Sequence, residues 1–119
     1  SHVVGKDLEL ISKHCPKLRS FSMEGKTMIV FTDLINLLRS CPICVLSVAG
    51  MGWPRPIRIQ AVDLIEMCTA NKTLARLMLD CAYIPDANKK NDDDLHSEAS
   101  NIKSLATHVS NGRVNVEWL

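Results

Sequence analysis

The dipeptide Asp-Leu recurs along the chain, and this repetition constrains the fold more than any other feature of the sequence. It begins at Asp7, Asp33, Asp63 and Asp94, so successive copies are 26, 30 and 31 residues apart. A repeat period of roughly 20 to 50 residues is typical of proteins built from stacked structural units. We therefore expect one domain over residues 1–119, divided into four units near residues 7–32, 33–62, 63–93 and 94–119.

Apolar residues follow each Asp-Leu at helical spacing, as in Leu34, Leu37 and Leu38. An aspartate at a helix start can accept hydrogen bonds from the free N–H groups of the first turn and interacts favourably with the positive helix end. Asp63, with Glu66 three residues later, has the form of a capping box. The sequence thus predicts a short amphipathic helix that begins at each Asp-Leu.

A turn and a short alternating segment follow each predicted helix. Pro16 and Pro42 disfavour helix in the residue before them. Apolar pairs spaced two residues apart then indicate strands with one buried face. These pairs are Phe21/Met23, Leu46/Val48, Leu77/Leu79 and Val116/Trp118. The last unit has a longer helical pattern, from Leu95 to Val109, as expected of a terminal unit that closes a stack. Between the third strand and that helix, residues 82–93 are polar and charged, which predicts a mobile surface loop.

The motif from Leu8 to Gly25 reads Leu-x-x-Ile-x-x-x-Cys-Pro-x-Leu-x-x-Phe-x-Met-x-Gly. It resembles the cysteine-containing class of leucine-rich repeat found in F-box/leucine-rich-repeat substrate receptors and related ribonuclease-inhibitor-like proteins. The resemblance implies an α/β fold, a right-handed leucine-rich-repeat solenoid fragment of about four helix-strand units, with a parallel sheet on the inner face and helices outside. An ordinary small α/β domain with similar helices by coincidence is the alternative.

Charge and cysteine content restrict the partners and the compartment. Fourteen Lys and Arg against thirteen Asp and Glu give a net charge of +1, so no overall field attracts nucleic acid or a membrane surface. Five cysteines are too few for a disulfide-stapled mini-protein, which favours reduced thiols in a cytoplasmic or nuclear protein. No apolar run approaches the roughly 20 residues of a membrane span, and we see no signal peptide.

The pair Cys41-x-x-Cys44 is the one spacing suited to zinc binding or thiol exchange. Zinc requires two further ligands, and the remaining cysteines and histidines contain no second close pair. We therefore expect packing cysteines, with no metal, no cofactor and no catalytic residue. A small zinc- or thiol-dependent domain remains the alternative.

Strand residues between the buried ones should face solvent on the inner side of the sheet and form a partner-binding surface. They are Ser20, Ser22, Glu24, Val45, Ser47, Ala49, Arg76, Met78, Asp80, Asn115 and Glu117. Val45 and Met78 would supply apolar contact. Trp53, in the stretch Trp53-Pro54-Arg55-Pro56, is a further candidate contact, or else a cover for the core of its own unit.

These features favour a non-enzymatic protein–protein interaction module. The family resemblance implies a role in substrate recognition or scaffolding in a ubiquitin-ligase complex, although we see no F-box segment. An RNA-handling accessory domain is a weaker alternative, because the near-neutral charge argues against binding nucleic acid.

Overall fold

A computed structural model describes residues 4–52 and 55–119, in which helices and strands alternate along the chain. The helices are α1 (Gly5–His14), α2 (Phe31–Ser40), α3 (Ala61–Thr69) and α4 (Asp92–Val109). The strands are β1 (Ser20–Met23), β2 (Val45–Val48), β3 (Arg76–Leu79) and β4 (Asn115–Trp118). Two short 3-10 helices, η1 (Cys81–Tyr83) and η2 (Ala87–Lys89), lie between β3 and α4. The predicted α/β class is confirmed.

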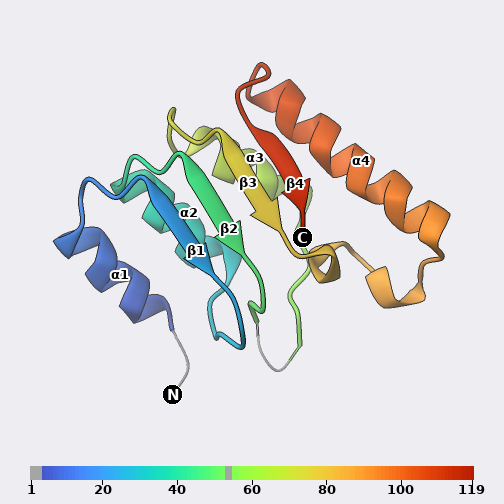
Figure 1. Ribbon diagram of the computed structural model, residues 1–119, viewed down its shortest axis with the longest axis horizontal. Coiled ribbons are helices and arrows are strands. Elements are labelled where there is room, and N and C mark those ends of the chain that lie inside the picture. The colour runs from blue at the N-terminus through green and yellow to red at the C-terminus, as the bar shows by residue number, and fades with distance from the viewer. Residues whose placement is uncertain (1–3, 53–54) are drawn as a thin grey trace.

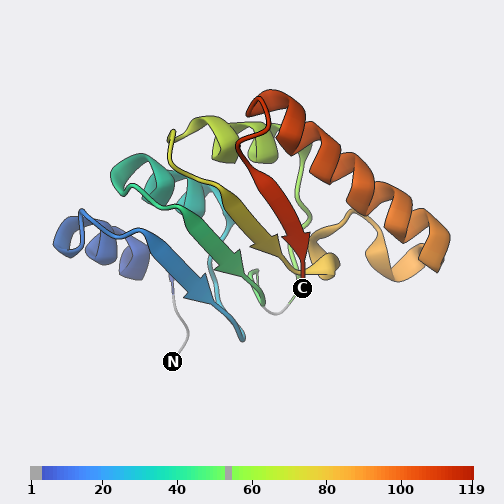
Figure 2. The same cartoon turned by 45° about the horizontal axis from the view of Figure 1, so that its top comes forward.

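The four strands form one parallel sheet in chain order, β1-β2-β3-β4 (Figure 1). Their register is continuous, because Ser20, Val45, Arg76 and Asn115 lie side by side as the first residues of the four strands. The helices all lie on one side of the sheet, as the two views together show (Figures 1 and 2). No helix of residues 4–52 and 55–119 covers the other side of the sheet.

The core lies between the sheet and the helices. Leu46, Leu77 and Val116 are fully buried neighbours across three strands and pack in the same cluster as helix residues such as Leu64. Phe21 is only half-buried, because β1 lies at an edge of the sheet and has a strand on one side alone. The predicted alternation is confirmed in all four strands, since every position expected to face inward packs in or against the core.

The helices begin two residues earlier than predicted. Each aspartate of the Asp-Leu pairs is the third residue of its helix. In the first three helices its carboxylate accepts a hydrogen bond from the backbone N–H of the residue that precedes the helix. The pairs are Val4 to Asp7 at 2.9 Å, Val30 to Asp33 at 3.0 Å and Gln60 to Asp63 at 3.1 Å. The predicted capping box between Asp63 and Glu66 is therefore wrong. The Oε2 atom of Glu66 instead lies 3.8 Å from the Nη2 atom of Arg39 in α2.

The segment after β3 is not uniformly a surface loop, in contrast to the prediction. Tyr83 and Ile84 are fully buried. The Tyr83 ring meets Phe31 edge-on, with centroids 5.6 Å apart, and its hydroxyl oxygen accepts a hydrogen bond of 3.0 Å from the Met51 N–H. Ile59 donates its N–H to the Tyr83 carbonyl at 2.7 Å. Tyr83 thus links the connections at the carboxyl ends of the strands.

Candidate partner-binding surface

The outward side chains of the four strands form a surface that we call the open face. It has two rows, which are Ser20, Val45, Arg76 and Asn115, and then Ser22, Ser47, Met78 and Glu117. Glu24, Ala49 and Asp80 follow the carboxyl ends of their strands directly. The structure therefore brings together every strand residue that the sequence assigned to the partner-binding surface. Val45 and Met78 are half-buried within the open face, so they present apolar area between polar neighbours.

An ion pair crosses the open face between β3 and β4. The Nε atom of Arg76 donates to Glu117 Oε2 at 2.8 Å, diagonally between the two rows. This hydrogen bond and the charge of Glu117 raise the pKa of the Arg76 guanidinium above its ordinary value. The side chains of Arg76 and Glu117 are 52% and 37% exposed, so solvent screens the pair, which contributes little to stability and acts mainly by fixing their orientation.

Charge is distributed unevenly along the strands of the open face. Arg76 lies in the row at the amino ends, while Glu24, Asp80 and Glu117 lie towards the carboxyl ends. Asp80 also uses Oδ1 to accept a hydrogen bond of 2.9 Å from the Ala82 N–H, which fixes its position at the start of η1. The open face thus offers carboxylates at one end and an apolar centre at Met78 and Val45.

The remaining predicted contact, Trp53, lies outside the described residues, so its placement stays a prediction. Residues 49–52, which precede it, follow β2 at the same end of the sheet as the carboxylates of the open face. Arg55 is exposed and donates its N–H to the Gly52 carbonyl at 2.9 Å.

The five cysteines are all unpaired. Cys41 and Cys68 are buried, and burial raises the pKa of each thiol, which opposes the thiolate form needed for metal binding. Cys44 is half-buried, and its Sγ atom accepts a hydrogen bond of 3.4 Å from Arg19 Nη2. Within residues 4–52 and 55–119, no three His, Cys, Asp or Glu side chains are grouped so that they could hold a metal ion. No observation therefore favours the zinc or thiol-exchange alternative.

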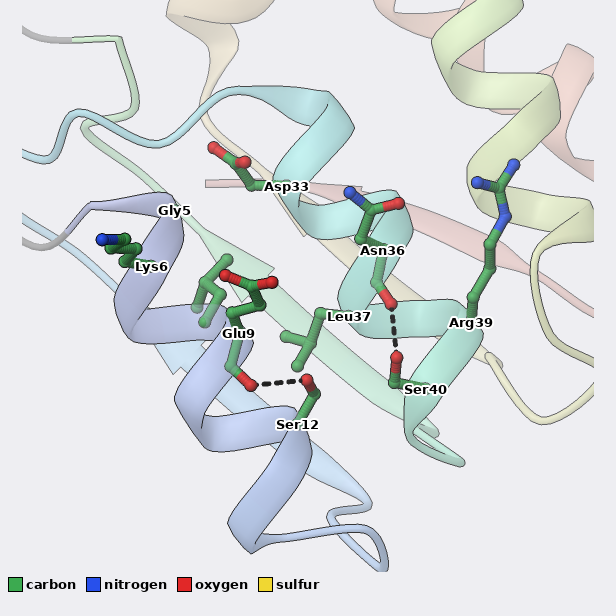
Figure 3. Close-up of a pocket in the computed structure, with 10 residues that line it drawn as sticks. Gly5, Lys6, Glu9, Ser12, Asp33, Asn36, Leu37, Arg39 and Ser40 are labelled. Carbon is green, nitrogen blue, oxygen red and sulfur yellow. Dashed lines mark hydrogen bonds between the residues drawn. The ribbon is translucent and has the colours of Figure 1, made fainter.

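A polar groove of about 610 Å³ lies on the helical side, between α1 and α2 (Figure 3). Gly5 allows this close approach, because an added Cβ there would stand 2.7 Å from Asp33 Oδ1. The hydroxyls of Ser12 and Ser40 line the groove but donate to carbonyls of their own helices, at 2.8 and 3.0 Å. Lys6, Asn36 and Arg39 also line the groove. The open face is the better candidate site, because it joins residues of all four strands in one register.

Comparison with protein-family models, curated proteins and solved structures found no match for this chain. No helix among the described residues has the length and apolar character needed to cross a bilayer. The functional argument consequently depends on the open face itself.

Proposed function

We propose that the chain is a non-enzymatic protein-binding module that holds a partner on the open face. The observation that carries this proposal is the one-sided covering of the sheet, which leaves two in-register rows of side chains facing away from the helices. A rigid strand scaffold holds such side chains in fixed positions, so less conformational freedom is lost when a partner binds.

The chemistry of the open face favours a protein segment with an apolar centre and basic residues at one end. Met78 and Val45 would contact the apolar centre, since methionine adapts its shape to different partners. The carboxylates of Glu24, Asp80 and Glu117 would face the basic residues. Complementary charge of this kind sets the orientation of the partner and speeds its association.

The finer proposal is a right-handed leucine-rich-repeat solenoid fragment that acts in substrate recognition or scaffolding in a ubiquitin-ligase complex. Two features support the repeat architecture. The aspartates of all four Asp-Leu pairs occupy the same helical position, and the strands pair in chain order without a change of register. The ubiquitin-ligase role depends on the resemblance of the motif from Leu8 to Gly25.

The test compares Met78→Asp with Val62→Asp, which places the same charge on the helical side. Val62 is 59% exposed on α3 and provides a matched control. Proteins captured by the wild-type chain should be retained by Val62→Asp and lost with Met78→Asp, while circular dichroism shows that both variants are folded. Equal capture by both variants would place the binding surface elsewhere.

Two synthetic peptides test the chemistry of the partner. They share the same apolar residues and differ in having lysines or glutamates at one end. The lysine peptide should bind more tightly and shift the amide resonances of Ser47, Met78 and Glu117, and added salt should weaken it. Equal binding of the two peptides, or shifts confined to the helices, would contradict the assignment.

A further inference from the structure

Cys15 and Cys41 occupy equivalent positions in adjacent helix-strand units. Each directly follows its helix, α1 or α2, and each is followed by a proline. The two cysteines are 26 residues apart, the same spacing as Asp7 and Asp33. The third unit has Asn71 at this position, so the two thiols are neighbours only at the junction of the first two units.

The Cys41 Sγ atom lies 3.4 Å from the carbonyl oxygen of Cys15 and donates its thiol hydrogen to it. The acceptor belongs to the second cysteine itself, so the two residues are already adjacent. A disulfide requires its two Cα atoms to lie roughly 4.4 to 6.8 Å apart. The Cys41 side chain is directed at the backbone of Cys15, and the bond would form after the Cys15 side chain turns towards it.

The environments of the two thiols differ in a way that assigns them different roles. Cys15 is exposed, whereas Cys41 is only 3% exposed. Burial, together with the nearby Cys15, raises the pKa of the Cys41 thiol, which makes Cys41 the less reactive of the two towards an oxidant. An oxidant in solution would therefore meet Cys15 first, and Cys41 is the thiol within reach of the product.

We propose that Cys15 and Cys41 form a site of oxidative modification at which a peroxide produces an intramolecular disulfide between the ends of α1 and α2. Cys15 attacks hydrogen peroxide to give a sulfenic acid, and the peroxide O–O bond breaks with release of one water. The Cys41 sulfur then attacks the Cys15 sulfur, the S–O bond breaks, and the hydroxyl leaves with the thiol proton as a second water. Two thiols are oxidised, and one peroxide is reduced to two waters.

The disulfide would tether α1 to the rest of the fold. This helix packs chiefly against α2, and β1 is an edge strand, so the first unit has neighbours on one side only. The closed loop encloses β1 and α2 and restricts their unfolded state, while the bond itself holds the end of α1 against the end of α2. Backbone amides of α1 should exchange hydrogen more slowly in the oxidised protein than in the reduced protein.

The experiment treats the full reduced chain with one equivalent of hydrogen peroxide, alkylates the remaining thiols, and maps cross-linked peptides by mass spectrometry without reduction. We expect a peptide pair joined through Cys15 and Cys41, which separates on reduction. Cys41→Ser should abolish this pair, whereas Cys44→Ser should leave its yield unchanged. Cys68→Ser is a matched control at a second buried cysteine and should also leave the yield unchanged.

Three outcomes would overturn the proposal. They are a disulfide between Cys41 and Cys44, a disulfide between the Cys15 residues of two chains, and overoxidation of Cys15 with Cys41 still reduced. If Cys41→Ser destabilised the fold, Cys15→Ser would provide the same test from the exposed side. That variant should show no cross-link and no slowing of α1 exchange after peroxide treatment.

Discussion

Truncation of two adjacent residues in β3 tests the face assignment on which the open face depends. Leu77 and Met78 are neighbours in the same strand, and their side chains point to opposite sides of the sheet. Leu77 is fully buried between Leu46 and Val116, its register neighbours in β2 and β4. Met78 lies between Ser47 and Glu117 and is half-buried.

Leu77→Ala should lower the free energy of unfolding by about 2 to 5 kcal/mol, because it removes buried methyl groups and leaves a cavity. The upper part of this range is expected, since β3 is flanked by strands on both sides and its inner face packs in the core, so the cavity cannot easily collapse. Met78→Ala removes partly solvated atoms and should cost about 1 kcal/mol or less.

Urea denaturation followed by circular dichroism measures both changes, and thermal unfolding provides a second readout. At roughly 4 °C per kcal/mol for a domain of this size, Leu77→Ala should lower the melting temperature by about 8 to 20 °C. A loss of stability in Met78→Ala equal to that in Leu77→Ala would show that the two faces have been confused. The open face would then not be a surface at all.

Two further predictions concern the loops at the carboxyl ends of the strands. Burial raises the pKa of Tyr83 to about 12. Because this value lies above the unfolded pKa of about 10, the stability contributed by the neutral hydroxyl is complete below pH 10 and is lost as the pH rises towards 12. The free energy of unfolding should fall by roughly 2 to 3 kcal/mol over this range. Tyr83 is the one tyrosine of the chain, so its ultraviolet absorbance reports this titration directly, and a native midpoint near 10 would contradict its burial. Gly50→Ala should destabilise the fold far more than Gly112→Ala in urea denaturation, because a Cβ at Gly50 would overlap the carbonyl of Gly25, whereas Gly112 has a similar positive φ and open space around it. Equal losses would mean that the φ angle alone, rather than the close approach of two loops, decides the cost.

The strands could be predicted from the sequence because their pattern depends on short-range order. Alternation of period two places Leu77 inside and Met78 outside whatever the neighbours are. The helices begin earlier than the sequence predicts, because an aspartate can stabilise a helix start either from the residue before the helix or from within its first turn. Asp33 could have preceded its helix and accepted bonds from the first turn, but it lies within the helix and accepts a bond from Val30, which has no polar side chain of its own to act as a cap.

The contacts that join distant parts of the chain could not be predicted in the same way. Arg76 and Glu117 pair across 41 residues, which requires the register of β3 against β4 to be known. Tyr83 is a single aromatic residue in a polar stretch, so average composition concealed its burial. The equal distances of Cys15 and Cys41 from Asp7 and Asp33 give the two cysteines matching positions in the repeat, but this match alone predicts packing residues and not their contact.

The helix ends are held by a series of contacts between successive units, and these contacts differ in strength. Cys41 donates a thiol to the Cys15 carbonyl at 3.4 Å, and Asn71 donates an amide to the Cys41 carbonyl at 3.5 Å. Arg113 donates its guanidinium to carbonyls of Cys68 and, at 2.6 Å, Leu74.

A thiol is the weakest of these three donors and a guanidinium the strongest. In the proposed repeat array the stability of each unit depends on its contacts with its neighbours. The junction of α1 and α2 has the weakest of these donors, and α1 packs chiefly against α2 alone, so local opening should begin there. A disulfide between Cys15 and Cys41 would replace the weak thiol hydrogen bond at the junction where an added bond increases stability most. Hydrogen exchange in α1 should therefore respond to oxidation more strongly than exchange in α3.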